Sequence, residues 1–356
     1  MSDSLKTGDV IGILGGGQLG RMLSVAAARL GFRSHIFEPS PSSPAADVAH
    51  AVTCASYNDE KALCKFAKSV DVITYEFENV PTSTLDTLEK FRTIQPGREA
   101  LRVSQDRVIE KDFINNLGLA TAPYVPIETI YDLKNAIKII GVPAVLKTRR
   151  FGYDGKGQAL LKREGDAEKA FKAMHGQFSV LEGFVEFSRE VSVIGARNAT
   201  GDLVCFDPGE NVHRNGILRT TKVPACLNTS ERTDAVLLAA KIMNKLEYVG
   251  VMGLELFVTG DGLIVNEFAP RVHNSGHWTQ NACIVDQFEQ HIRAIAGWPL
   301  SDGTRYNDIV MENLIGADVK KASKLAGIKN VAIHLYGKTT IKKGRKMGHF
   351  NRILTE

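Results

Sequence analysis

The first third of the sequence alternates between short apolar runs and amphipathic stretches, and this alternation constrains the fold more than any other feature. Apolar runs cover 10–14, 34–37 and 70–75, and a helical pattern covers 18–30 between the first two. Alternating strands and helices favour a parallel sheet with helices on both faces. Functional groups of such sheets gather at the carboxyl ends of the strands. We therefore predict a Rossmann-like α/β domain over 1–105.

The simple alternation of strands and helices ends near residue 104. A helix is predicted over 106–117, and short strands and hairpins follow it. Two of these strands, 143–147 and 158–161, flank a glycine-rich loop. We predict a mixed α+β domain over 106–300 and a small third domain over 301–356.

Composition excludes several classes of protein. The chain has 356 residues, 44% of them hydrophobic and 24% charged, which is typical of a globular protein with roughly two or three domains. No apolar run approaches the ~18 residues that a membrane helix needs, and the polar start of the chain does not resemble a signal peptide. The 5 cysteines include no C-x-x-C pair. We expect a cytoplasmic protein without disulfides, without a cysteine zinc site and without a membrane partner.

The charge is distributed unevenly along the chain. The net charge is +4, but residues 318–356 hold ten Lys and Arg against two Asp and Glu. Such a basic segment could contact nucleic acid, or it could bring phosphate ligands to a site built elsewhere. No aromatic residue interrupts the basic cluster at 342–349, so we favour phosphate or carboxylate binding and expect no nucleic-acid partner.

A G-x-G-x-x-G pattern follows the first strand and opens the first helix. Gly15, Gly17 and Gly20 fill its three positions. Glycines let the backbone approach a phosphate closely, and the start of a helix offers free N–H groups. A dinucleotide site with Glu38 on the ribose and a tight turn without a ligand both remain open, but we favour a phosphate of some kind.

A second glycine-rich loop, over 152–158, lies between two predicted strands. This context differs from a Walker loop and from a Rossmann turn, each of which connects a strand to a helix. We predict a mobile flap whose amides fold over a polyphosphate, with Lys147 and Lys156 neutralising its charge. A plain hairpin loop is the alternative.

A β-hairpin is predicted from 253 to 268, closed by a Gly-Asp-Gly turn. If Thr259 pairs with Leu263, Glu255 lies directly opposite Glu267. Facing carboxylates repel each other, and a divalent cation between them removes this repulsion. Oxygen ligands beside substrate phosphates favour Mg²⁺. Regular alternation points Asn266 to the other face, so its participation needs a local distortion; a solvated hairpin with two unrelated acids is the alternative.

A dense polar loop follows this hairpin. Arg271 has the planar, charged group that suits a phosphoryl group or a small oxyanion. His273 and Asn274 are candidates for orienting a nucleophile, whereas His277 and Trp278 are expected to serve packing.

Taken together, these elements resemble the ATP-grasp ligase superfamily, and more narrowly the N5-carboxyaminoimidazole ribonucleotide synthetases of bacterial and fungal purine biosynthesis. The matching phrases span nearly the whole chain in the order of that family: GGGQLGR (15–21), YEFENV (75–80), GYDGKGQ (152–158), NEFAPRVHNSGHWTQ (266–280) and RKMGH (345–349). The resemblance implies a Rossmann-like amino-terminal domain, then an ATP-grasp domain and a small carboxyl-terminal domain that contributes to the substrate site.

The resemblance also implies a role for each matching position. ATP would be held by Arg107, Lys147, Gly152, Tyr153, Asp154, Gly155, Lys156, Gly157, Gln158, Glu182, Gly183, Phe184, Val185, Glu190, His213, Asn266 and Glu267. Mg²⁺ would be bound by Glu255 and Glu267. Catalysis would involve Arg271, His273 and Asn274, which hold bicarbonate, together with Lys346 and Asp154, the latter ordering the flap. The ribonucleotide would face Gln18, Leu19, Glu76, Arg345 and Lys346, with the first glycine turn serving its phosphate.

The implied reaction is the ATP-dependent carboxylation of 5-aminoimidazole ribonucleotide by bicarbonate through carboxyphosphate, carried out by a homodimer. Another ATP-grasp ligase with a different amine acceptor is the nearest alternative. A nicotinamide-dependent dehydrogenase would leave the carboxylate hairpin unexplained, and a nucleic-acid-binding protein would leave the interior loops unexplained.

Overall fold

The computed structural model describes residues 4–152 and 155–354, and its first sheet is the parallel sheet that the sequence predicts. Its four strands lie in the order β3-β2-β1-β4, with parallel pairing throughout. Their bounds are Val10–Leu14 (β1), Arg33–Phe37 (β2), Ala51–Thr53 (β3) and Val72–Tyr75 (β4). The helices of this region are α1 (Gln18–Arg29), α2 (Glu60–Lys68), α3 (Thr82–Leu88) and α4 (Arg98–Ser104).

Helices cover both faces of this sheet, as expected. Leu23 of α1 packs with Ile11 and Ile13 on one face, and Phe66 of α2 packs with Phe37 on the other. The first of these two cores continues into the rest of the molecule, where it includes residues of α10 (Gln287–Ile295). Strands β1 and β4 are therefore packed against the second half of the chain through this core.

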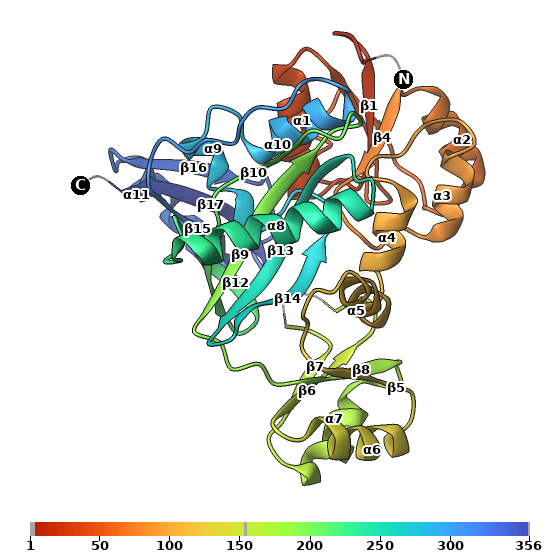
Figure 1. Cartoon of the computed structure of the whole chain (residues 1–356). Helices are drawn as coiled ribbons and strands as arrows, with labels where there is room; N and C mark the ends of the chain where they lie inside the picture. Colours follow the sequence, from red (N-terminus) through yellow and green to blue (C-terminus); the bar gives the residue numbers. More distant parts are fainter. Residues whose placement is uncertain (1–3, 153–154, 355–356) are drawn as a thin grey trace.

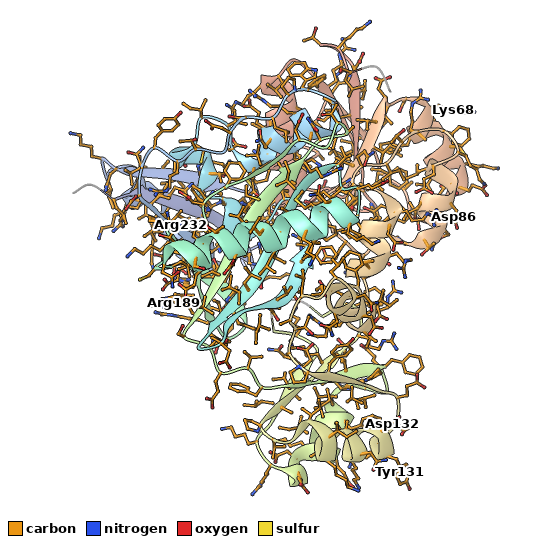
Figure 2. The ribbon with its side chains drawn as sticks, viewed as in Figure 1. Lys68, Asp86, Tyr131, Asp132, Arg189 and Arg232 are labelled. Atoms are coloured by element: carbon orange, nitrogen blue, oxygen red, sulfur yellow. The ribbon has the colours of Figure 1, made fainter. Side chains whose placement is uncertain are left out.

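The second sheet is antiparallel and forms a separate lobe (Figure 1). Its order is β5-β8-β6-β7, with strands Tyr124–Ile127 (β5), Ala144–Thr148 (β6), Gln158–Leu161 (β7) and Ser179–Gly183 (β8). Helices α6 (Ile130–Ile140) and α7 (Ala167–Ala173) pack on this sheet through a small apolar core. A capping box between Thr129 and Asp132 starts α6 at the far end of the lobe (Figure 2).

The third sheet has nine strands and carries most of the functional residues. Its order is β14-β13-β9-β11-β12-β15-β17-β16, and β10 pairs with β9. The bounds are Arg189–Arg197 (β9), Leu203–Cys205 (β10), Gly209–Arg214 (β11), Ile217–Val223 (β12), Gly250–Thr259 (β13), Gly262–Ala269 (β14), Ile309–Ile315 (β15), Val331–Leu335 (β16) and Lys346–Ile353 (β17). Helix α8 (Thr229–Lys245) crosses one face of the sheet (Figure 1). Strands β15 to β17, which follow residue 301, thus extend the sheet that contains the predicted carboxylate hairpin.

Helix α5 (Arg107–Asn116) lies where the lobe meets the body (Figure 1) and confirms the helix predicted over 106–117. Asp106 caps its first turn by accepting the N–H of Val108 at 3.0 Å. The short helices α9 (Thr279–Ala282) and α11 (Ala322–Ala326) and the 3₁₀ turns Glu164–Asp166, Asn274–Gly276 and Gly316–Lys321 complete the elements.

No helix within 4–152 and 155–354 has both the length and the apolar character needed to cross a bilayer. All five cysteines are free thiols.

Candidate active site

The hairpin of β13 and β14 brings Glu255 and Glu267 face to face, as the sequence predicts. The predicted register at the turn is wrong, because Thr259 pairs with Gly262 and not with Leu263. A bulge at Asn266 compensates for this offset of one residue and places Glu267 opposite Glu255. The bulge is also the local distortion that Asn266 needs to reach the acids: its Nδ2 donates to Glu255 Oε2 at 3.4 Å.

The two carboxylates have opposite electrostatic environments. Burial would raise the pKa of Glu267, but the guanidinium of Arg107, 2.7 Å from Glu267 Oε2, outweighs burial and lowers this pKa to about 2. Burial and the negative charge of Glu267 raise the pKa of Glu255 to about 7. A positive charge placed between the two carboxylates would therefore stabilise the ionised form of Glu255.

The donor set fits Mg²⁺ bound together with a phosphate ligand. Within the described residues, no group of three or more His, Cys, Asp and Glu is placed to hold a metal ion by itself. Two carboxylates and a neighbouring amide are instead typical of Mg²⁺ sites, where waters and substrate phosphates fill the remaining positions.

Three charged side chains meet between α5 and the sheet of the lobe. Glu182 Oε2 lies 2.8 Å from Lys147 Nζ and 3.4 Å from Lys111 Nζ. Burial lowers the pKa of Lys111. Burial acts to raise the pKa of Glu182, but Lys147 and Lys111 lower it overall. The other oxygen of Glu182, Oε1, is buried and accepts no hydrogen bond from the described residues, so it is an acceptor available to a ligand.

Lys111 and Glu110 are further candidate site residues that the sequence patterns did not indicate. Glu110 accepts the N–H of Phe268 at 2.7 Å, next to Glu267, and burial raises the pKa of Glu110 to about 8. Both residues follow Arg107 by about one helical turn, so they share its face of α5. This spacing, in a predicted amphipathic helix, is the signal that could have identified them.

The predicted flap is described except for Tyr153 and Asp154, which lie outside the described residues. Gly157 has a φ of 68°, and a Cβ at this position would lie 2.6 Å from the Thr148 hydroxyl. A Cβ at Gly155 would lie 3.0 Å from the backbone of Gly216 in the turn between β11 and β12. Both positions therefore require glycine, and the loop that contains Gly152, Lys156 and Gln158 lies against the large sheet.

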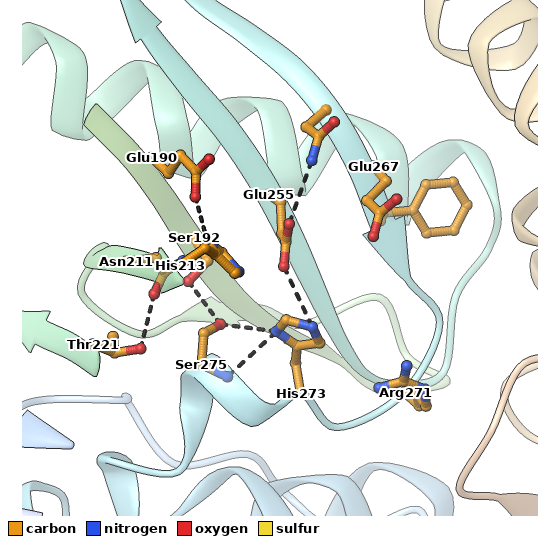
Figure 3. A network of polar contacts seen from close by, with 12 residues as sticks. Glu190, Ser192, Asn211, His213, Thr221, Glu255, Glu267, Arg271, His273 and Ser275 are labelled. Atoms are coloured by element: carbon orange, nitrogen blue, oxygen red, sulfur yellow. Dashed lines mark hydrogen bonds and ion pairs between the residues drawn. The ribbon is translucent and has the colours of Figure 1, made fainter. Parts of the chain in front are cut away.

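The predicted ATP-binding residues Gly183, Phe184 and Val185 lie on the segment that leaves the lobe. Gly183 and Phe184 donate their N–H groups to Pro123 and Pro143, and Val185 follows them. Glu190 on β9 and His213 on β11 form a hydrogen-bonded pair across neighbouring strands (Figure 3). Burial acts to lower the pKa of His213, but the contact with Glu190 raises it overall.

The loop after β14 places Arg271, His273 and Asn274 beside the acidic pair. Arg271 Nε lies 2.6 Å from Glu78 Oε2, and His273 Nε2 lies 3.5 Å from Glu255 Oε1 (Figure 3). The amide of Asn274 is buried, and neither its oxygen nor its nitrogen has a hydrogen-bond partner among the described residues. Such a buried amide is available to a ligand. Glu78, which follows β4 in the chain, is a further candidate site residue through this ion pair.

In the first glycine turn, carboxylates of the chain itself accept three backbone N–H groups. Glu76 accepts the N–H groups of Gly17 and Gly20, and Glu38 accepts that of Gly16 at 2.8 Å. Three of the N–H groups that could hold a phosphate or a dinucleotide are therefore already bound to carboxylates. The neighbouring Leu19 side chain belongs to the apolar core, so only its backbone is available to a substrate, whereas Gln18 is partly exposed.

The basic carboxyl-terminal segment supplies a cation to the same region. Lys346 begins β17 and acts electrostatically on both His273 and His213. Arg345, next to it, donates to the carbonyl of Thr340 at 3.1 Å. His277 and Trp278, in contrast, are buried, and the His277 ring stacks on His349 with centroids 4.6 Å apart, as expected of packing residues.

Comparisons with known proteins identify the family to which this chain belongs. Family models match three consecutive parts of the chain: a ribonucleotide synthetase preATP-grasp domain at residues 9–105, an ATP-grasp domain at 112–288 and a phosphoribosylaminoimidazole carboxylase carboxyl-terminal domain at 309–356. The N5-carboxyaminoimidazole ribonucleotide synthase of Brucella melitensis is 52% identical over 353 residues, which cover 98% of each chain.

Solved structures give the same result. The synthetase of Thermus thermophilus is 42% identical, with a TM-score of 0.91 over 97% of this chain and 93% of its own. The Aspergillus clavatus enzyme, solved with ADP and 5-aminoimidazole ribonucleotide, is 28% identical, with a TM-score of 0.91 over 98% of this chain and 94% of its own. With sequence identity along its whole length, and with the three domain models in the same order, this chain belongs to the N5-carboxyaminoimidazole ribonucleotide synthase family.

Proposed function

We propose that this protein catalyses the ATP-dependent carboxylation of 5-aminoimidazole ribonucleotide by bicarbonate, giving N5-carboxyaminoimidazole ribonucleotide, ADP and phosphate in de novo purine biosynthesis. The observation that carries the proposal is the Glu255–Glu267 pair beside Arg107 and the loop of Arg271 and His273. This arrangement places residues that can bind a nucleotide next to residues that can bind a small anion. The relative crystallised with ADP and the aminoimidazole ribonucleotide supports the choice of substrates.

In this proposal, the nucleotide lies between the lobe and the large sheet. Lys147, Arg107 and the amides of the flap neutralise its phosphates, the segment Glu182, Gly183, Phe184 and Val185 lines the adenine, and Glu190 and His213 lie beside the ribose. Glu255 and Glu267, with Asn266 next to them, would hold Mg²⁺, which supplies positive charge at the phosphate oxygens when it is bound.

Bicarbonate is a poor electrophile, so it must first be activated. Its oxygen attacks the γ-phosphorus of ATP, and the bond to the β-phosphate oxygen breaks, which gives carboxyphosphate and ADP. Arg271, His273 and Asn274 hold the anion, and Arg271 faces the negative charge that spreads over the transferring group. Glu78 keeps the guanidinium of Arg271 oriented through their ion pair.

The exocyclic amine of the ribonucleotide then attacks the carboxyl carbon of carboxyphosphate. Phosphate leaves, and the amine proton passes to the released phosphate or to a base. Carboxyphosphate hydrolyses readily, so the flap has a second role in excluding water. Asp154, outside the described residues, is proposed to order the flap.

We propose that Arg345 and Lys346 bind the phosphate of the ribonucleotide, and that Gln18, the backbone of Leu19 and Glu76 lie near its ribose. Since carboxylates already accept the turn amides, the cations of the basic segment are the better phosphate ligands.

The division into domains at 1–105, 106–300 and 301–356, a cytoplasmic location and a homodimeric assembly also belong to this proposal. The five free thiols support a reducing compartment.

The test is an ADP-release assay with a panel of amine acceptors, each with and without bicarbonate. We expect full activity only when 5-aminoimidazole ribonucleotide and bicarbonate are both present. Equal or greater stimulation by a different amine would instead support the alternative, an ATP-grasp ligase with another acceptor.

A further inference from the structure

The His273 ring belongs to a chain of hydrogen bonds that runs away from the acidic pair (Figure 3). Its Nδ1 lies 2.8 Å from Ser275 Oγ and accepts the backbone N–H of Ser275 at 3.4 Å. Ser275 Oγ in turn accepts the hydroxyl proton of Ser192, on β9, at 2.7 Å. Both serines are buried, so water does not compete for these contacts.

The direction of this chain decides where the imidazole proton lies. A backbone N–H can only donate, so Nδ1 must offer it a lone pair. Ser192 donates to Ser275, so the hydroxyl proton of Ser275 can point to the same Nδ1. The single lone pair of Nδ1 is then shared, with the hydroxyl at 2.8 Å as the main donor and the backbone N–H at 3.4 Å as the weaker one. The ring is therefore neutral, with its proton on Nε2, the nitrogen that lies 3.5 Å from Glu255 Oε1.

The backbone of His273 is held as firmly as its ring. Gln287, fully buried on α10, accepts the N–H of His273 at 2.9 Å and donates to its carbonyl at 2.7 Å. On the opposite side, a Cβ at Gly253 would lie 2.6 Å from the Cβ of His273, so β13 packs directly against the residue. These contacts fix the backbone and the Cβ from which the ring extends toward the serine chain.

We propose that Ser275 and Ser192 are positioning residues that keep His273 in the Nε2–H form, so that its ring donates a hydrogen bond to an oxygen of bicarbonate or carboxyphosphate. This inference rests on the proposed function and adds to it the positioning roles of Ser275 and Ser192. A donor without net charge stabilises an oxyanion without repelling the neighbouring Arg271 and Lys346. In this form His273 presents no lone pair to the site, so the amine proton goes to another acceptor.

The tautomer is measured first, in the full chain without nucleotide. The protein is prepared with ¹⁵N in its histidine rings, and long-range ¹H–¹⁵N spectra are recorded; the signals of His273 are those lost in His273→Gln. We expect a protonated Nε2 and an unprotonated Nδ1. A proton on Nδ1, or on both nitrogens, would overturn the proposal whatever the enzyme's activity.

Kinetics then test whether the chain matters for the reaction. Ser275→Ala should lower kcat/KM for bicarbonate by about tenfold, the size of one lost hydrogen bond, leave KM for ATP unchanged, and add the Nδ1–H form to the spectrum. Ser192→Ala should act in the same direction but less strongly, and Ser192→Thr, which keeps the hydroxyl, should restore both readouts.

Thr221→Val is the matched control. It removes another buried hydroxyl, whose hydrogen bond of 2.8 Å goes to Asn211 and not to the serine chain (Figure 3). It should leave the His273 spectrum and the bicarbonate dependence unchanged. If Ser275→Ala changed neither of these more than Thr221→Val does, the serines would be structural only and the proposal would be wrong. If the wild-type chain released no ADP in response to bicarbonate and the ribonucleotide, the proposed function would fail while the tautomer result still stood.

Discussion

Replacing Glu255 by Gln should make the metal-free protein more stable at pH 8, although it removes a candidate metal ligand. Burial and the facing Glu267 raise the pKa of Glu255 from 4.5 to about 7. At pH 8, Glu255 is therefore ionised in the folded chain at a cost. A neutral amide of the same shape avoids this cost, and the Asn266 amide beside it can turn to accept the new N–H group.

The size of the effect follows from the same values. A rise in pKa from 4.5 to about 7 corresponds to about 3 kcal/mol at 1.36 kcal/mol per pKa unit. Between these two pH values the folded chain keeps the Glu255 proton that the unfolded chain has lost, so wild-type stability falls as pH rises. The gain from Glu255→Gln should be near zero below pH 4.5 and reach about 2 to 3 kcal/mol at pH 8.

Urea unfolding followed by circular dichroism, in EDTA at pH 5 and pH 8, measures this gain. The matched control is Glu267→Gln at pH 5, where Glu255 is protonated and the Glu267 charge no longer repels it. Arg107 lowers the pKa of Glu267 to about 2, so this change should reduce stability. Its side chain is 40% exposed, so screening should limit this loss to about 1 kcal/mol. A loss of stability in Glu255→Gln at pH 8, or a gain that does not depend on pH, would refute the reasoning.

Three further outcomes are expected. Glu267→Ala should nearly abolish ADP release while the far-ultraviolet circular dichroism stays unchanged; near-normal activity in the folded variant would reject the metal-binding role of Glu267. Arg271→Ala should raise KM for bicarbonate more than KM for ATP, and Glu78→Gln should do the same more weakly; a loss of ATP affinity alone would contradict the oxyanion role. Lys111→Met should leave the urea midpoint unchanged or raise it, because burial already disfavours the ammonium and Glu182 keeps Lys147 at 2.8 Å. The same variant should raise KM for ATP in the ADP-release assay, and a clearly lower midpoint would show that Glu182 needs both cations.

The sequence predicted those parts of the site that short-range patterns determine. The parallel sheet follows from the spacing of apolar runs, and the pairing of Glu255 with Glu267 follows from a turn and a period of two. The bulge at Asn266 does not follow from either, because a turn shortened by one residue and a bulge leave the same residues opposite each other beyond the bulge. The correct pair was therefore predicted from an incorrect register at the turn.

Contacts between distant segments were beyond the reach of sequence patterns. Glu78 and Arg271 are separated by 193 positions, and Lys111 and Glu182 lie on different elements. The glycine turn shows a second limit. The motif indicates backbone N–H groups that can bind an anion, but it does not indicate their acceptors, and here Glu38 and Glu76 accept three of them. The roles of the individual site residues stay predictions, and the variants described above test them.

The continuous nine-stranded sheet has a consequence for how the substrates meet. Lys346 on β17 and Glu255 on β13 belong to a single hydrogen-bonded array of strands. The distance between the groups proposed to bind the acceptor and those proposed to activate bicarbonate is therefore set by the strand pairing within one sheet. If the enzyme opens and closes during turnover, we expect the four-stranded lobe to move and the carboxyl-terminal strands to stay in place, because they belong to the same sheet as Glu255.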